Sequence, residues 1–322
     1  MMRLWQRMRL NRFVVLGRVG MDLYADPPGT KIEGAGRYFA AIGGSAGNIA
    51  VALARQGAGA ALLSCVSDDA VGRYCRAELQ GYGVDVSLLR VAGGETRTSL
   101  AVVETVPVGA QTVLYRNGAA DFALGRADVE GVSFDDVAAL VVTGTALARE
   151  PSRGAVEAAV ARAKAAGALV VLDLDWRAYS WASREEAAAV CLRMAEASCI
   201  VIGNDEEFAL LAGGEAEGAA LARALARRGA LFTVYKRGAA GSVTHTPDYS
   251  FESGIYPVEA LKPMGAGDGF MGGLLAGLAA GFPLEVAVKR GAATAAMIVA
   301  GVGCAPASPT RDALEGFMRG RG

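Results

Sequence analysis

Histidine is almost absent from this chain, and cysteine is scarce and scattered. The one histidine, His245, excludes histidine-rich metal sites, and a Ser-His-Asp mechanism would depend on it alone. It lies between two threonines in a predicted strand or turn, where we expect a surface residue. The five cysteines are odd in number and have no metal-ligand spacing. This usage is typical of reduced, mostly buried thiols in a cytoplasmic protein.

Long apolar runs and an excess of charge of either sign are also missing. Charged residues, prolines and glycines interrupt every apolar run before it reaches a bilayer-spanning length. The net charge is −1, so nothing points to nucleic acid or to an anionic membrane surface. Residues 1–12 are basic but lack a long apolar segment, which predicts a short, poorly ordered leader and no secretion signal. We therefore expect a cytoplasmic protein with no nucleic-acid or membrane partner.

What the chain does contain is a regular alternation of apolar strand-like runs and alanine-rich helical stretches. Hydrophobic residues make up 52% of the 322 residues, enough for the core of a large α/β domain. Short apolar runs predict strands at 13–17, 60–66, 139–143, 169–174, 199–202 and 231–236. Helices are predicted at 48–56, 152–166, 184–195 and 217–228. This order predicts a three-layer α/β fold, a doubly wound, mostly parallel sheet with helices on both faces.

Two stretches break the alternation. Residues 31–41 and 96–117 alternate polar and apolar side chains, and the second has the pattern of a hairpin. We expect lid strands within about 24–42 and 96–118, forming a small β-sheet lid inserted into a single domain over 12–312.

The most informative stretch is Gly265-Ala266-Gly267-Asp268, which leads into a small-residue, apolar segment that predicts a buried helix. Backbone N–H groups at a helix mouth point outward, and the helix dipole favours an anion there. An ionised Asp268 at the same mouth is available as a proton acceptor. An anion cradle beside a carboxylate base suits phosphoryl transfer to an alcohol. The alternatives are an ordinary loop-to-helix entry and, for Asp268, a helix N-cap.

Three further motifs precede this one along the chain. They are Gly43-Gly44-x-x-x-Asn48, Asn204-Asp205-Glu206-Glu207 and Lys236-Arg237-Gly238-x-x-Gly241. Together with the GAGD motif, they resemble the ribokinase-like (PfkB) family of carbohydrate kinases over about residues 13–310. The resemblance implies a ribokinase-like fold, ATP and Mg²⁺ as cofactors, and a sugar as acceptor. No GxxxxGK[ST] motif or dinucleotide glycine fingerprint is present, which argues against a Walker P-loop and a Rossmann oxidoreductase.

The resemblance also implies roles for the residues of the GAGD motif. Asp268 is expected to accept the proton of the sugar's primary hydroxyl as that oxygen attacks the γ-phosphate. The backbone N–H groups of Gly265, Ala266 and Gly267 are expected to hold the charge on the transferred group. Gly265 and Gly267 thereby also contact ATP.

The two middle motifs are assigned to the nucleotide and its metal. By resemblance, Lys236, Gly238 and Gly241 belong to a turn that passes over the nucleotide. Asn204 and Glu207 lie one helical turn apart after a strand end, and we expect them to hold Mg²⁺ largely through water. The ordinary interpretations are a β-turn and a helix start.

The first motif is assigned to the acceptor. Asp22, expected to end the first strand, is a candidate for binding hydroxyls. Gly43 and Gly44 would let the backbone approach a ligand closely, and the amide of Asn48 can both donate and accept hydrogen bonds. Close packing of small residues is the alternative interpretation.

Two arginines point to an acidic acceptor. Arg116 comes from the predicted lid and Arg177 from a strand end, and two guanidinium groups converging on one cleft suit a carboxylate. Either arginine could instead form a surface ion pair. The segments 140–147 and 173–181 resemble members that phosphorylate 5-dehydro-2-deoxy-D-gluconate, in inositol catabolism. The most specific expectation is therefore phosphorylation of the terminal hydroxyl of this keto-deoxy sugar acid.

Three alternatives stay open. Two are a 2-keto-3-deoxygluconate kinase and a kinase of a neutral sugar such as fructose or ribose. The third, of another class, is a non-catalytic sugar- or nucleotide-binding regulatory protein. A homodimer formed through the lid is also expected from the resemblance.

The residues flanking GAGD depart from the family pattern. Lys262 and Pro263 replace a common Asp-Thr pair, and Gly269 replaces a common Ser or Thr. In some members the Asp helps to form a monovalent-cation site, so Lys262 leaves a role for K⁺ open. Pro263 stiffens the approach and Gly269 loosens the helix start, but both leave the base and the cradle intact. We therefore expect activity to survive.

Overall fold

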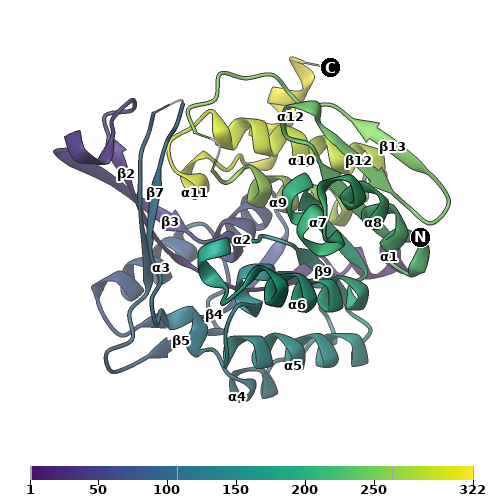
Figure 1. The fold of residues 1–322 in the computed structure, drawn as a ribbon, viewed down its shortest axis with the longest axis horizontal. Helices are drawn as coiled ribbons and strands as arrows, with labels where there is room; N and C mark the ends of the chain where they lie inside the picture. The colour runs from purple at the N-terminus through teal and green to yellow at the C-terminus, as the bar shows by residue number, and fades with distance from the viewer. Residues whose placement is uncertain (1, 107, 263, 322) are drawn as a thin grey trace.

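A nine-stranded main sheet and a separate four-stranded sheet form the framework of the protein (Figure 1). The structure is a computed structural model that describes residues 2–106, 108–262 and 264–321. Within these residues the main sheet has the order β13-β12-β11-β10-β9-β8-β1-β4-β5, parallel from β11 to β5 and antiparallel at β12 and β13. Its strands are β1 (Arg12–Leu16), β4 (Gly59–Ser67), β5 (Leu89–Ala92), β8 (Ala139–Thr143), β9 (Leu169–Asp173), β10 (Ile200–Asn204), β11 (Phe232–Lys236), β12 (Ser242–His245) and β13 (Ser250–Ser253).

Helices cover both faces of the main sheet. On one face lie α1 (Met2–Met8), α2 (Ser45–Arg55), α3 (Ala70–Gly81), α9 (Ala266–Ala279), α10 (Leu284–Val299) and α11 (Cys304–Ala307). On the other lie α4 (Arg126–Glu130), α5 (Ser152–Ala165), α6 (Arg184–Ala197), α7 (Asp205–Ala212) and α8 (Glu215–Arg228). The last helix, α12 (Arg311–Arg319), follows α11. The predicted three-layer α/β fold is confirmed.

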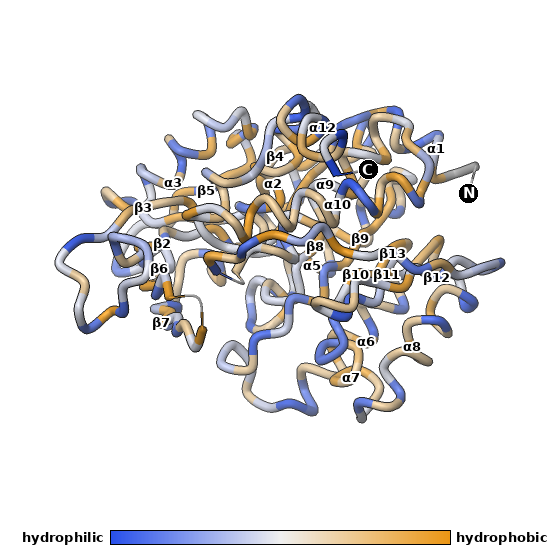
Figure 2. The backbone as a smooth tube through the Cα atoms, turned by 90° about the horizontal axis from the view of Figure 1, so that it is seen from above, coloured by the Kyte–Doolittle hydropathy of each residue, from blue (hydrophilic) through white to orange (hydrophobic). Residues whose placement is uncertain are grey.

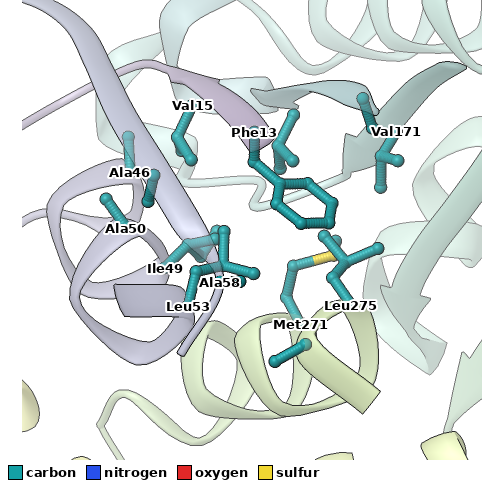
Figure 3. Packing of buried hydrophobic residues seen from close by; sticks show 14 of the residues in the cluster. Phe13, Val15, Ala46, Ile49, Ala50, Leu53, Ala58, Val171, Met271 and Leu275 are labelled. Atoms are coloured by element: carbon teal, nitrogen blue, oxygen red, sulfur yellow. The ribbon is translucent and has the colours of Figure 1, made fainter. Parts of the chain in front are cut away.

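The pleat of β1 shows how the two cores form. Phe13 and Val15 pack with α2 and α9, as Figure 3 shows, whereas Val14 and Leu16 enter the core on the opposite face. Because successive side chains of a strand point to opposite faces, a strand covered on both faces is apolar along its whole length. The hydrophobic colouring along the central strands β8 and β9 in Figure 2 follows this rule.

The second sheet has the place expected of the lid. Its strands are β2 (Gly20–Asp26), β3 (Arg37–Gly43), β6 (Ser99–Val103) and β7 (Thr112–Tyr115), in the order β3-β2-β6-β7. In Figure 1 its strands stand at the left of the molecule, away from the body of the main sheet. Asp22 lies inside β2 of this sheet, so its predicted position at the end of the first strand is wrong.

Two local expectations are also corrected. The N-terminal segment is helical, and Leu4 and Met8 are buried in the core, so the predicted poorly ordered leader is wrong. His245 is buried in β12, where its Nδ1 lies 2.7 Å from Ser250 Oγ, and is not a surface residue. The five cysteines are free thiols, four of them buried, as predicted. In the described part of the chain, no helix is long and apolar enough to cross a membrane.

Candidate active site

A cavity of about 1410 Å³ lies between the lid and the carboxyl ends of β9, β10 and β11. In parallel α/β sheets, ligands bind at this edge because the strands end there together and loops enclose the space beyond. All predicted site residues except Gly43 line the cavity. They are Asp22, Gly44, Asn48, Arg116, Arg177, Asn204, Glu207, Lys236, Gly238, Gly241, Gly265, Ala266, Gly267 and Asp268.

The start of α9 forms the floor of an anion site. Gly265 is the N-cap residue, with a left-handed φ of 80°, and as a glycine it has no side chain with which to cap the helix. A Cβ atom at Gly265 would lie 2.5 Å from Cys304 Sγ, so both the conformation and the packing require glycine. The first N–H groups of a helix have no intrahelical partner. Asp268 lies in the first turn and does not cap it, so the alternative of a purely capping Asp268 is wrong.

The carboxylate of Asp268 is held in place and has a shifted pKa. Asn48 Nδ2 donates to Asp268 Oδ2 at 2.8 Å. Burial, followed by the nearby Asp175 carboxylate, raises the pKa of Asp268 to about 6, while Asn48, Arg177 and Lys236 oppose the rise. Asp268 is therefore ionised near neutral pH and takes up a proton readily, as a general base must.

Lys236 brings positive charge to the same helix mouth. It ends β11, and its Nζ lies 3.2 Å from the position that a Cβ atom would have on Gly267. Over the residues that the structure describes, no hydrogen bond or ion pair engages this ammonium group. After Lys236 the chain passes through a 3₁₀ turn, Gly238–Ala240, and Gly241 leads into β12. The predicted turn thus lines the cavity beside the anion site.

Two acidic residues of the cavity were missed as site residues by the sequence analysis. Asp173 ends β9, and burial raises its pKa well above the usual range. Asp175 has a positive φ of 34° and accepts hydrogen bonds from Ser45 Oγ and Thr145 Oγ1. Strained backbone in a non-glycine residue is common at functional sites. The signal was available, since an Asp-x-Asp pair directly follows the apolar run of a predicted strand.

Asn204 and Glu207 start α7 with a reciprocal capping box. Glu207 N donates to Asn204 Oδ1, and Asn204 N donates to Glu207 Oε2, each at 2.8 Å. Glu207 is buried, and its Oε1 also accepts from Trp176 N at 3.2 Å. Each of these oxygens can accept one more hydrogen bond. They therefore suit a cation that keeps its water molecules, which can donate those bonds, better than a dehydrated cation. The described residues contain no cluster of three metal-ligating side chains.

The part of the cavity next to the lid and α2, called the acceptor end here, contains two buried oxygens that have no partner among the residues that the structure describes, Asp22 Oδ1 and Asn48 Oδ1. Burial raises the pKa of Asp22, and Tyr24 O–H donates to its other oxygen at 3.2 Å. A Cβ atom on Gly43 would lie 1.9 Å from Asp22 Oδ1, so Gly43 acts by making room for this carboxylate. Buried acceptors are nearly always paired, so these two suit a ligand that carries hydroxyl donors.

The two arginines differ from the prediction and from each other. Arg116 is buried in an ion pair with Asp121, and two further N–H groups donate to Ser180 Oγ and the Thr145 carbonyl. Arg116 therefore presents no free fork to a carboxylate, because nearby groups occupy most of its N–H donors, but it lines the cavity and its contact with a substrate stays a prediction. Arg177 pairs with Asp175 at 2.9 Å and donates to the Trp176 carbonyl at 2.9 Å, but its side chain is 46% exposed and lines the cavity. Arg177 retains N–H groups for a ligand.

Comparisons with known proteins agree on one family. The family model described as pfkB family carbohydrate kinase matches residues 10–311. A 5-dehydro-2-deoxygluconokinase from Photobacterium profundum is 38% identical over 96% of this chain and 95% of its own length. One from Geobacillus thermodenitrificans is 33% identical, with coverages of 95% and 93%. A Vibrio cholerae fructokinase double mutant, solved with fructose, ADP and a potassium ion, is 28% identical, with a TM-score of 0.83 and coverages of 95% and 98%.

Proposed function

Since this chain belongs to the pfkB family of carbohydrate kinases, we propose that it phosphorylates the terminal primary hydroxyl of 5-dehydro-2-deoxy-D-gluconate at the expense of ATP. The observation that carries the proposal is the Asp268 carboxylate in the first turn of an uncapped buried helix, beside Lys236. The names of the related proteins support the choice of acceptor.

The reaction uses the two ends of the cavity together. Asp268 takes the proton from the acceptor hydroxyl as its oxygen forms a bond to the γ-phosphorus of ATP. The bond between that phosphorus and the bridging oxygen breaks, and ADP leaves with the electron pair. Backbone N–H groups of Gly265, Ala266 and Gly267 and the Lys236 ammonium stabilise the charge on the transferred group.

The nucleotide lies along the turn that contains Gly238 and Gly241, beside the anion site. Asn204 and Glu207 would hold Mg²⁺ through its water molecules, since their oxygens line the cavity and can each accept another hydrogen bond. The bound ion supplies neutralisation of phosphate charge.

Arg177 and the two unpartnered oxygens select the acceptor. Asp22 Oδ1 and Asn48 Oδ1 accept hydrogen bonds from sugar hydroxyl groups, and the Arg177 guanidinium binds the carboxylate. One arginine that is already paired with Asp175 and has only some N–H groups left supports a sugar acid less strongly than the two arginines expected from the sequence. A kinase of 2-keto-3-deoxygluconate or of a neutral sugar therefore remains the alternative.

ADP release in the presence of Mg-ATP tests the proposal against a panel of acceptors. The panel contains 5-dehydro-2-deoxygluconate, 2-keto-3-deoxygluconate, fructose, ribose and a nucleoside. We expect the highest kcat/KM with 5-dehydro-2-deoxygluconate. Turnover of neutral acceptors alone would refute the carboxylate site, and binding of ATP and sugar acid without any ADP release would favour the regulatory-protein alternative.

Three further expectations are part of the proposal. Residues 12–312 form one kinase domain, with the lid strands inserted in it. Exposed apolar side chains of the lid, Phe39, Val113 and Tyr115, support a homodimer formed through the lid. Sedimentation velocity measures the mass of the protein in solution and so tests the dimer. The third expectation, a cytoplasmic location, stays a prediction.

A further inference from the structure

Lys262 is a fully buried cation that belongs to none of the roles above. Its side chain is among the largest that are entirely buried, with 1% of the residue exposed. The Nζ atom donates to the main-chain carbonyls of Met264 at 3.0 Å and Ile298 at 3.2 Å, and it lies 3.7 Å from Cys304 Sγ. The Tyr24 ring centroid lies 6.0 Å away. A buried charge is costly unless its donors are satisfied, and here all three have a partner.

The groups around Lys262 position the anion site. Met264 directly precedes Gly265, the N-cap of α9, and both Cys304 and Ile298 lie within 3.2 Å of where a Cβ on Gly265 would be. The backbone N–H groups of Leu261 and Lys262 also donate to the Val299 carbonyl, at 2.8 and 3.2 Å. The Lys262 ammonium therefore links the loop before the anion site to the end of α10 and the start of α11.

A monovalent cation does not fit at this place. Potassium binds main-chain carbonyl oxygens, and the two carbonyls gathered here already accept hydrogen bonds from a cation. The bulk of a lysine side chain fills the space between them. The fructokinase from Vibrio cholerae was solved with a potassium ion, so a related kinase can bind one. In this chain a covalently attached positive charge lies between the two carbonyls.

We propose that Lys262 is a built-in cation that holds the anion-site loop in its active shape and makes turnover independent of bound potassium. This inference rests on the proposed kinase function. It assigns Lys262 a positioning role, because its Nζ contacts the loop carbonyls and not the reacting atoms.

The test compares wild type, Lys262→Met and Lys262→Ala in potassium chloride and in tetramethylammonium chloride at equal ionic strength. Wild-type kcat is expected to be the same in both salts. Lys262→Met keeps the bulk without the charge, so kcat should fall by about tenfold or more in both salts, as expected for lost charge-assisted hydrogen bonds. Lys262→Ala leaves the space between the two carbonyls open, so its kcat should be about tenfold higher in potassium chloride than in tetramethylammonium chloride.

A second readout separates this inference from the kinase assignment. Potassium should raise the Tm of Lys262→Ala and leave that of wild type unchanged, whether or not an acceptor is found. A matched control, Lys289→Met, removes an exposed lysine of α10 and should behave as wild type in every assay. Potassium-dependent turnover of the wild type, undiminished kcat in Lys262→Met, or an equal response of Lys262→Ala to both salts would overturn the inference. A wild type that turns over no acceptor would refute the proposed function, and the Tm arm would then decide on Lys262.

Discussion

The phosphate end and the acceptor end of the cavity are built in different ways. At the phosphate end, the backbone N–H groups belong to the start of α9, a helix that is buried from Gly269 to Leu278. This helix packs closely on α2, since a Cβ atom on Gly272 would lie 2.4 Å from the Ala52 side chain. At the acceptor end, side chains converge from the lid, from α2 and from the end of β9. In the proposed reaction, core packing would therefore hold the groups that act on the phosphate, whereas a few polar side chains would select the acceptor.

Removing the base at the phosphate end should have the largest effect. Asp268→Asn keeps the shape of the side chain but cannot accept the proton, so we expect kcat to fall by roughly 10²–10⁴-fold. Tm and ATP affinity should change little, since Asp268 does not cap α9. Steady-state ADP release and calorimetric ATP titration measure the two quantities. Turnover equal to wild type would remove Asp268 from the mechanism.

The charge beside the helix mouth should matter nearly as much. Lys236→Met removes an ammonium group from the anion site, and we expect a loss of roughly 10²-fold in kcat, as for other groups that stabilise transition-state charge. Arg237→Met is the matched control, because this neighbouring cation is not among the residues that line the cavity. Equal effects of the two changes on ADP release would show that Lys236 acts only through the overall electrostatic potential of the protein and not at the anion site.

At the acceptor end, the two arginines should separate specificity from stability. Arg177→Met should lower kcat/KM for a sugar acid by roughly 10–100-fold more than for a neutral acceptor, because the acid alone loses a charge-assisted contact. Arg116→Met leaves Asp121 buried without its partner, so it should cost about 3–5 kcal/mol of unfolding free energy, seen as a lower Tm. An acid-specific loss in Arg116→Met with unchanged Tm would reverse these assignments.

The smallest expected effect is a shift in the pH dependence of kcat/KM. It links the two ends of the cavity, because Asp175 influences the pKa of Asp268. Below its pKa of about 6, Asp268 carries a proton and cannot act as base, so kcat/KM should fall as the pH drops through 6. The Asp175 carboxylate raises this pKa, so Asp175→Asn should move the acid limb to lower pH. The exposed Asp205→Asn serves as control. An acid limb that stays in place in Asp175→Asn would argue that Asp268 does not govern it.

The parts that the sequence predicted well depend on local patterns. The strand at 139–143 and the helix at 152–166 were found almost to the residue, because hydrophobic period and turn residues are local signals. The signal of the GAGD motif is equally local, since the N–H groups of the anion site come from the backbone of consecutive residues.

The parts that were missed depend on partners distant in the sequence. Arg116 is occupied because folding brings Thr145 and Ser180 to it, and no pattern around residue 116 reveals them. The burial of Lys262 likewise requires the carbonyl of Ile298, which lies 36 residues further along the chain. The predictions that fall on Pro263 lie outside the described residues.

Phosphorus NMR of the reaction products tests the central claim most directly. The protein is incubated with Mg-ATP and 5-dehydro-2-deoxygluconate, and the spectrum is recorded with proton coupling. Transfer to a terminal primary hydroxyl predicts a new phosphomonoester signal split into a triplet by the two protons of the adjacent carbon, formed in equal amount with ADP. Inorganic phosphate as the only product, or a doublet from a secondary ester, would contradict the account.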